Sequence, residues 1–337
     1  MREEEIRPSD FLEEYLRLSK EDVETFFPRK SHRQDRPCPA CGGASHASAF
    51  QKNGFDLVTC VDCATLFVNP APSEDLLSEF YRDSPSQRYW SDVFFPAVSE
   101  ARREKIFRPR AMRINDLMRD LGVAITSTTD VGAGTGLFAD ECSAIGFGGD
   151  LSVIEPNRSM AATLRDRDYR VFEGFSGEAL ADPAWASSAG LVTSFEVIEH
   201  VVSPHTFISE LAKLAEPGGY ILFTGPCGTG FDVLLLQEHS NTVFPPHHLN
   251  FISRHGVELL VKRCGLELVS FLTPGELDVE LVEKKFKQDP SIINDLFVAH
   301  VLESGDPDVL AGLQDFLSEN GLSSHMWVVA RKPLADG

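Results

Sequence analysis

The sequence lacks any long hydrophobic run. No apolar stretch in its 337 residues reaches the roughly 18 residues that cross a bilayer, so we expect no membrane-spanning helix and no membrane partner. The first residues, MREEEIRPSD, are acidic and lack the basic and then apolar segments of a secretory signal. Internal repeats and low-complexity tracts are also absent. These absences favour a cytoplasmic protein.

Positive charge is scarce, with 31 Lys and Arg against 51 Asp and Glu and a formal net charge of −20. A protein that holds a phosphate backbone over a broad face needs a basic surface, so we expect no nucleic-acid partner. A small anionic substrate held by a few arginines stays compatible with this charge. Hydrophobic residues make up 42% of the chain, enough for a full core in one large domain with appendages.

Cysteine is also sparse, but four of the seven cysteines form two C-x-x-C pairs. Cys38 and Cys41 form the first pair, and Cys60 and Cys63 follow after 18 intervening residues. This spacing is typical of a tetrahedral Zn²⁺ site, and in a cytosolic chain it favours metal binding over disulfides. Four sulfur ligands leave no position for water, so the predicted zinc is structural. Unrelated cysteines or a redox pair are the alternative.

A glycine-rich stretch runs from Asp130 through Gly132, Ala133 and Gly134 to Gly136. It follows a β-branched run and precedes an apolar helical pattern. The pattern predicts a strand, a tight turn and a helix N-terminus, which together bring backbone close to a nucleotide-like ligand. A dinucleotide fingerprint would be G-x-G-x-x-G, whereas here the third glycine comes one position early. A turn that binds NAD or nothing is the alternative.

The pattern D-x-G-x-G-x-G resembles the first motif of class I S-adenosylmethionine (SAM) methyltransferases. The resemblance implies that the glycine loop passes under the methionine part of SAM and that the acid orders its amino group. The next strand ends at Glu155, where a carboxylate can accept both ribose hydroxyls, and Pro156 turns the chain. In the family an aspartate after the third strand reaches the adenine. Here Phe175 stands in its place, followed by Ser176, so stacking or a backbone contact must replace the acid.

The fourth predicted strand, residues 191–195, continues into Glu196-Val-Ile-Glu199-His200. This resembles the "EH" signature of many small-molecule methyltransferases, in which the strand end lies beside the transferred methyl group. Helix capping is the alternative role. The predicted SAM-binding residues are Asp130, Gly132, Ala133, Gly134, Gly136, Glu155, Pro156, Phe175, Ser176, Phe195 and Glu196.

Strands and helices alternate from residue 126, which predicts an α/β fold with a mostly parallel sheet. The resemblance implies a Rossmann-like seven-stranded methyltransferase sheet of order 3-2-1-4-5-7-6. The predicted parts are N-terminal helices (1–36), a zinc-binding module (37–72), a helical lid or linker (73–121) and the methyltransferase domain (122–335). A helical insertion at 274–321 precedes the last strand and covers the substrate side or forms a homodimer face. The module resembles the N-terminal zinc-binding domain of some bacterial sugar C-methyltransferases.

The densest aromatic stretch contains Tyr89 and Trp90, and a run of arginines follows it. One interpretation makes the two aromatic residues part of a lid, with arginines that meet a carboxylate or phosphate. The other is an amphipathic helix with solvated bases and a buried aromatic edge.

Methyl transfer from SAM is an in-line displacement, and a hydroxyl or carbon acceptor also needs a base. The candidates near the ends of the fourth and fifth strands are His248, His247, His200 and Glu196, and Asn250 is a predicted substrate contact. We favour His248 because it follows an irregular loop after the fifth strand. His247 is its rival, since neighbouring side chains in an extended segment point to opposite faces. A purely structural role for these histidines is the alternative.

These patterns predict a SAM-dependent methyltransferase that acts on a small molecule. The resemblance points to a nucleotide-linked or glycan sugar of surface-polysaccharide or natural-product biosynthesis. The alternative is an inactive adaptor that binds SAM and zinc within a partner complex.

Overall fold

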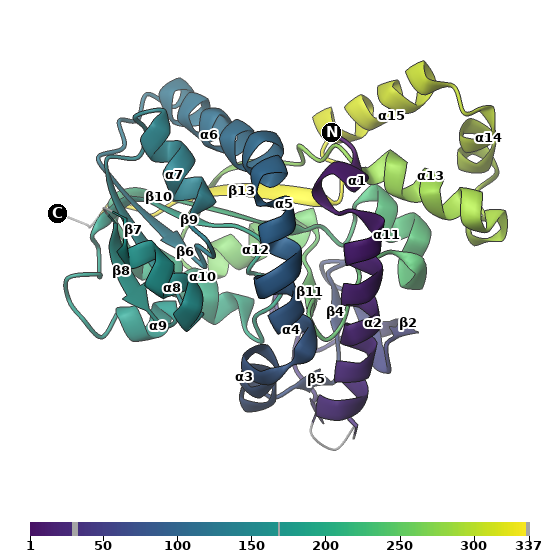
Figure 1. The fold of residues 1–337 in the computed structure, drawn as a ribbon, viewed down its shortest axis with the longest axis horizontal. Helices are drawn as coiled ribbons and strands as arrows, with labels where there is room; N and C mark the ends of the chain where they lie inside the picture. Colours follow the sequence, from purple (N-terminus) through teal and green to yellow (C-terminus); the bar gives the residue numbers. More distant parts are fainter. Residues whose placement is uncertain (29–32, 168, 335–337) are drawn as a thin grey trace.

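The computed structural model describes residues 1–28, 33–167 and 169–334. Residues 29–32 of the predicted N-terminal segment and residue 335, the predicted domain end, lie outside this part. At the centre is a seven-stranded sheet (Figure 1). Its strands are β6 (Ser127–Val131), β7 (Asp150–Glu155), β8 (Arg170–Glu173), β9 (Ala189–Ser194), β10 (Ala215–Pro226), β12 (Glu267–Leu272) and β13 (His325–Arg331).

The strand order is β8-β7-β6-β9-β10-β13-β12, which confirms the predicted order 3-2-1-4-5-7-6. Strands β8, β7, β6, β9 and β10 run parallel, and β13 lies antiparallel between β10 and β12. The carboxyl ends of the parallel strands therefore meet at one edge, where ligands bind in sheets of this kind.

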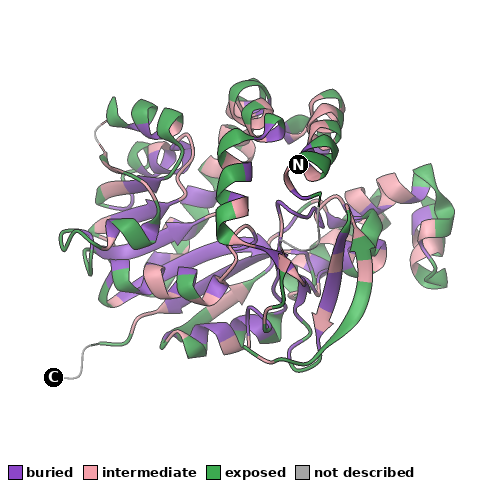
Figure 2. Ribbon diagram, turned by 90° about the horizontal axis from the view of Figure 1, so that it is seen from below, coloured by how far each residue is buried: buried purple, intermediate pink, exposed green. Residues whose placement is uncertain are grey.

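Helices cover both faces of the sheet, and its strands are largely buried (Figure 2). On one face, α6 (Arg108–Asp120) and α7 (Leu137–Ala144) share a core with Leu222 of β10. On the other face, α10 (Pro204–Leu214) and α12 (Arg254–Arg263) share a core with Phe223. Leu222 and Phe223 are adjacent in β10 and pack into the cores on opposite faces of the sheet. This follows because successive side chains of a strand point to opposite faces. The shorter helices α8 (Arg158–Arg165) and α9 (Ser176–Ala179) follow β7 and β8.

The N-terminal helices lie against the helical linker. The elements are α1 (Glu3–Ile6), α2 (Ser9–Phe26), α3 (Glu74–Asp83), α4 (Pro85–Tyr89) and α5 (Phe95–Arg102), and π-helical turns occupy Trp90–Phe94 and Arg103–Phe107. Phe11 of α2 stacks on Phe94 with ring centroids 5.8 Å apart, and Tyr15 contacts Trp90 at 5.3 Å. Aromatic pairs of this kind hold the linker and α2 together beside the sheet (Figure 1).

The cysteine module contains a four-stranded antiparallel sheet of order β11-β4-β3-β2. Its strands are β2 (His46–Lys52), β3 (Phe55–Cys60), β4 (Leu66–Val68) and β11 (Asn250–Phe251), and a separate pair joins β1 (Arg33–Gln34) to β5 (Ala71–Pro72). Strand β11 comes from the segment after β10, so the predicted range 37–72 does not contain the whole module.

Arg36 joins the module to the methyltransferase part of the chain. Its Nε donates to the carbonyl oxygen of Val68 (3.1 Å), while Nη1 and Nη2 donate to those of Val202 (2.7 Å) and Leu249 (3.0 Å). Burial of the guanidinium lowers the pKa of Arg36 to about 10. Arg36 therefore ties the module to the segments that carry Val202 and Leu249.

The insertion before the last strand is helical, as the sequence predicts, and forms three helices. They are α13 (Asp278–Gln288), α14 (Leu296–Ser304) and α15 (Pro307–Glu319), with a short 3-10 turn at Pro290–Ile292. Together with α11 (Phe231–Leu236), which a 3-10 turn at Gln237–His239 follows, they enclose a small core of their own that includes Leu236, Val282 and Phe286. Among the helices that the described residues form, none combines the length and apolar character needed to cross a membrane.

Candidate active site

The carboxyl edge of the parallel strands opens into a cavity of about 1560 Å³. Most of the residues singled out in the sequence line it. These are Trp90, Asp130, Gly132, Ala133, Gly134, Glu155, Pro156, Phe175, Ser176, Phe195, Glu196, His200, His247 and His248. The described residues that line it include neither Tyr89, Gly136 nor Asn250.

Gly136 has a packing role, and its contact with SAM stays a prediction. It is the N-cap of α7 with a φ of +76°, and a Cβ there would lie 2.4 Å from Leu164 Cδ2. The glycine is therefore required by backbone conformation and by the adjacent helix. The sequence pattern did not distinguish this requirement from close approach of a ligand.

Asn250 and Tyr89 are likewise placed away from the cavity. Asn250 is buried, and its Nδ2 donates to the carbonyl oxygens of Ile198 (3.0 Å) and Val201 (2.8 Å). It fixes the turn that carries Glu199 and His200, and its predicted substrate contact stays a prediction. Tyr89 is the last residue of α4, and its neighbour Trp90 lines the cavity.

Glu155 and the glycine loop form the first half of the site. Gly134 N–H donates to Glu155 Oε2 and Asn157 N–H donates to Oε1, both at 2.7 Å. Burial raises the pKa of Glu155, and these two donors act in the opposite direction. Each carboxylate oxygen keeps a further lone pair for a ligand hydroxyl. Gly134 has a φ of +57°, and a Cβ there would meet no atom within 4 Å, so bare backbone faces the cavity.

This half fits the nucleoside of SAM. A buried carboxylate at the end of β7 suits a ribose diol, and an open glycine loop suits the methionine part. Asp130, at the end of β6, is buried and accepts a hydrogen bond from Thr193 Oγ1 at 2.7 Å. Burial raises the pKa of Asp130 to about 7, while the Thr193 hydroxyl and the charge of Arg110 oppose the rise.

Glu196 lines the cavity and hydrogen-bonds to residues of β10 and β13. It is one of the non-glycine residues with positive φ, at +55°, a strained conformation that often marks functional sites. Its Oε1 accepts hydrogen bonds from His325 Nε2 (2.7 Å) and Thr224 Oγ1 (2.5 Å), and Arg110 Nη2 lies 3.7 Å away. No local pattern in the sequence singles out His325, although an antiparallel last strand must begin at this same edge.

His200 and His248 are oriented by backbone carbonyls. Nδ1–H of His200 donates to the oxygen of His247, and Nδ1–H of His248 donates to the oxygen of Thr242, each at 2.7 Å. A carbonyl can only accept, so in the neutral rings both Nε2 atoms keep a lone pair. Burial, followed by the charge of His200, lowers the pKa of His248 to about 3, which makes this ring a weak base.

His247 is held differently. Gln87 Nε2 donates to its Nδ1 at 3.0 Å, so the hydrogen of the neutral ring lies on Nε2. Its ring stacks on Phe244, with centroids 5.0 Å apart and an interplanar angle of 4°. Between the two rival histidines, only His248 therefore offers a free lone pair.

Guanidinium groups of Arg7, Arg102 and Arg110 also line the cavity. Within the described part of the chain, Arg102 Nε and Nη1 are buried without a hydrogen-bond partner. Burial, with repulsion from Arg7 and Arg110, lowers the pKa of Arg102 to about 9. The run of bases in the sequence indicated such groups but did not show which of them face inward.

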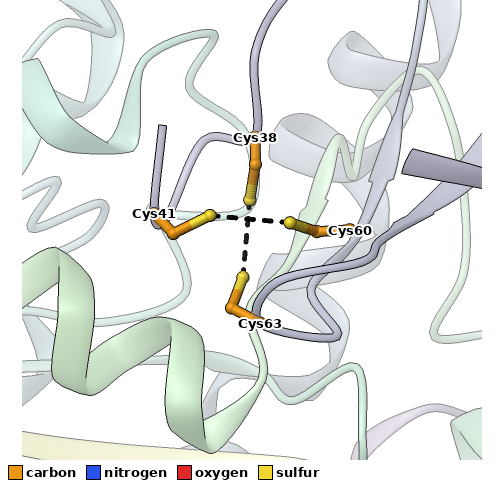
Figure 3. A group of neighbouring side chains, drawn as sticks. All are labelled: Cys38, Cys41, Cys60 and Cys63. Carbon is orange, nitrogen blue, oxygen red and sulfur yellow. Dashed lines mark hydrogen bonds between the residues drawn. The ribbon is translucent and has the colours of Figure 1, made fainter. Parts of the chain in front are cut away.

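The four cysteines of the paired motifs converge within the module (Figure 3), and none of the four lines this cavity. Cys38 Sγ lies 3.6 Å from Cys63 Sγ, and Cys41 Sγ lies 3.5 Å from Cys60 Sγ. Tetrahedral zinc with bonds of about 2.3 Å places its sulfurs about 3.8 Å apart. The arrangement fits a closed four-thiolate site with no position for a substrate.

Comparison with known proteins concerns mainly the central sheet. Residues 126–271 match a family model described as a methyltransferase domain. The chain is 32% identical over 102 residues to the ubiquinone biosynthesis O-methyltransferase of Burkholderia vietnamiensis, which covers 28% of this chain and 42% of that protein. For the protein of the same name from Caulobacter vibrioides, identity is 34% over 118 residues, with coverage of 32% and 44%. The chain thus spans less than half the length of these curated relatives.

Solved structures of similar fold include a SAM-dependent methyltransferase from Archaeoglobus fulgidus. Its TM-score is 0.47 and its sequence identity is 16%, with coverage of 72% of this chain and 100% of that one.

Proposed function

We propose, from the premise that residues 126–271 form a class I SAM-dependent methyltransferase domain, that this protein methylates a hydroxyl group of a small molecule. The observation that carries the proposal is that the Glu155 carboxylate with its glycine loop and the His200–His248 pair face one cavity. SAM, when bound, supplies an electrophilic methyl group on a sulfonium. The chain's own task is to hold an acceptor oxygen in line with that methyl.

In this proposal, the cofactor half of the cavity is Asp130, Gly134, Glu155 and Phe175. Glu155 accepts the ribose hydroxyls while its backbone donors keep it oriented. Phe175, whose side chain is 59% exposed, offers a ring face for the adenine in place of the family's aspartate. Asp130 faces the amino group of the methionine part.

The acceptor half is bounded by Glu196, His200, His248 and the arginines. A hydroxyl acceptor is supported by the O-methyltransferase name of the curated relatives and by the free Nε2 lone pairs of His200 and His248. The assignment of His248 as a general base stays a prediction.

An anionic acceptor is supported by Arg102, because two of its buried nitrogens have no partner among the described residues. A nucleotide-linked sugar would supply phosphate groups for it. A sugar acceptor rests otherwise on the resemblance of the cysteine module alone.

For the module we propose a structural Zn²⁺ held by Cys38, Cys41, Cys60 and Cys63. The second Cys pair packs at the N-terminus of α12, where Ser253 Oγ donates to the carbonyl oxygen of Cys63. The zinc would hold the small sheet against this helix, since a module of this size has too little core to fold alone.

The test is a mass-spectrometric assay of purified protein with SAM and a panel of nucleotide-linked sugars and phenolic acceptors. We expect a mass gain of one methyl group on one class of acceptor and production of S-adenosylhomocysteine. The matched control is Gly134→Ala, whose added methyl group occupies open cavity space and should abolish SAM binding. Because the φ of Gly134 is +57°, we also expect this variant to lose about 1–2 kcal/mol in the free energy of unfolding. Calorimetric binding of NAD without binding of SAM would overturn the proposal. SAM binding with no turnover of any acceptor would favour an adaptor protein.

A further inference from the structure

We propose that Glu199, His200 and His248 form a binding site for a first-row divalent cation in the acceptor half of the cavity. One ligand atom from each residue lies within 4.8 Å of the other two, and all three residues line the cavity. The site is separate from the four-cysteine cluster. Its catalytic role rests on the proposed methyl transfer, whereas its existence does not.

The two imidazoles are already arranged as metal ligands. Their Nδ1–H groups are used by the backbone carbonyls of His247 and Thr242, which leaves each Nε2 lone pair free. A hydrogen bond from the second ring nitrogen to a carbonyl is the usual way in which proteins orient a metal-binding histidine. Since the ring centroids lie 5.0 Å apart, the two rings can reach one ion together.

Glu199 supplies the independent observation. Its side chain is 1% exposed, and its Oε2 has no hydrogen-bond partner in the described part of the chain. Oε1 lies 3.9 Å from His200 Nε2. A buried carboxylate without a partner is costly, and a bound cation would remove that cost.

The backbone around this carboxylate is fixed from the opposite side. Asn250 Nδ2 donates to the carbonyls on both sides of the Glu199–His200 pair, and Leu249 N–H donates to the carbonyl oxygen of Glu199 at 2.7 Å. These contacts come from the same segment that carries His248. The turn and the histidine segment are therefore held in a fixed relation, as a metal site requires.

The ligand set determines the class of ion. Two imidazole nitrogens and one carboxylate suit Mn²⁺, Fe²⁺ or Zn²⁺, whereas Ca²⁺ and Mg²⁺ prefer oxygen ligands throughout. Three protein ligands leave coordination positions open for a substrate oxygen. The acceptor would then be a molecule whose hydroxyl can bind a metal ion.

Coordination would serve the proposed reaction by lowering the pKa of that hydroxyl. The hydroxyl releases its proton to solvent, and its oxygen forms a bond to the methyl carbon. The bond between sulfur and carbon breaks with its electron pair left on sulfur, so the products are the methyl ether and S-adenosylhomocysteine. If His248 acted as a general base, it would use the same Nε2 lone pair. That role would not explain why the buried Glu199 Oε2 has no hydrogen-bond partner among the described residues.

The test uses Mn²⁺ as a probe of the full-length protein with its cysteine zinc retained, because thiolate sites favour zinc over manganese. Electron paramagnetic resonance should show one bound Mn²⁺ per chain. Glu199→Gln and His200→Gln should each weaken binding at least about 10–100-fold. His255→Gln, which alters an exposed histidine on α12, is the matched control and should bind Mn²⁺ normally.

Melting temperatures separate loss of the site from loss of the fold. Without Mn²⁺, Glu199→Gln should melt no lower than the parent, because it keeps the size of a buried carboxyl group whose Oε2 has no hydrogen-bond partner among the described residues. With Mn²⁺, only the parent should gain stability. Absence of Mn²⁺ binding, or unchanged binding in both variants, would overturn the metal site. SAM-dependent transfer that persists after a mild chelator has removed Mn²⁺, with zinc content unchanged, would overturn its catalytic role and leave the proposed function standing. Mn²⁺ binding without SAM binding would support the site while the proposed function fails.

Discussion

Asp130 shows how burial changes a residue that the sequence already singles out. Its pKa rises from an ordinary 3.8 to about 7 in the folded protein, chiefly through burial. When folding raises the pKa of a carboxyl group, the free energy of unfolding is unaffected by that group below its pKa in the unfolded chain. It falls as the pH rises above this value towards the pKa in the folded protein. Asp130→Asn should therefore stabilise the protein by about 2–4 kcal/mol at pH 8 and by almost nothing at pH 4 or below.

Urea unfolding of the parent and the variant at both pH values measures this difference. The exposed Asp150, at the start of β7, provides the control, and Asp150→Asn should give no comparable dependence on pH. An equal effect of Asp130→Asn at both pH values would contradict the argument.

Glu155 is the second residue-scale case, because both of its oxygens accept backbone N–H groups. In Glu155→Gln one of the two oxygens becomes an NH₂ group, which must face the N–H of Gly134 or of Asn157. Both groups are then hydrogen-bond donors, so that hydrogen bond is lost. We expect SAM affinity to fall by about 1.5–3 kcal/mol, the usual worth of a hydrogen bond to a charged group. Calorimetric titration with SAM measures it, with Glu267→Gln, an exposed residue of β12 at the opposite edge of the sheet, as the control. A variant that binds SAM as tightly as the parent would exclude a ribose contact at Glu155.

At the scale of elements, the two-residue strand β11 depends on Arg36 as well as on its pairing with β4. Arg36→Lys retains the charge but cannot span three carbonyl oxygens with one ammonium group. The oxygen of Leu249 keeps a hydrogen bond from Val68 N–H at 2.9 Å, so only the oxygens of Val68 and Val202 compete for the ammonium group. A buried acceptor without a donor costs about 1–3 kcal/mol, so we expect a loss of about 1–3 kcal/mol in the free energy of unfolding.

Urea denaturation checks this value. Arg88→Lys is the control, because Arg88 is exposed on α4 and should change stability by less than about 0.5 kcal/mol. Equal midpoints for Arg36→Lys and the parent would mean that the module is held by its apolar core alone.

At the scale of the whole molecule, the zinc module and the large sheet share one core that includes Phe67, Ile252 and Val257. Elemental analysis of protein purified without chelators should return about one zinc per chain. Cys60→Ser should remove the zinc and lower the melting temperature of the whole chain in a single transition. Cys264→Ser, which alters a cysteine outside the cluster, should retain the zinc and the melting temperature of the parent. Zinc-free protein with a normal melting temperature would contradict the prediction.

Self-association through residues 274–321 stays a prediction from the sequence. The segment exposes Leu296 and Phe297 on α14, at 87% and 72%. If these side chains form the face between two copies, Phe297→Glu should convert a dimer into a monomer in sedimentation velocity. A parent protein that sediments as a monomer at high concentration would contradict it.

The strand order followed from the resemblance to class I SAM methyltransferases. The sequence by itself determined the alternation of strands and helices, the glycine loop with Glu155, and the four-cysteine motif. Each depends on short-range signals, namely strand and helix periodicity, turn residues and ligand spacing. Rules of chain connection then leave few arrangements for alternating strands and helices.

Only the tertiary structure decided which polar groups meet. Arg36 and Leu249 are 213 positions apart, and Glu196 and His325 are 129 apart. The free lone pair of His248 depends on the carbonyl of Thr242, and the placement of Asn250 depends on a turn 49–52 residues earlier. No local pattern records such pairs, because the energy that selects them arises only after the chain has packed and the buried groups must find partners.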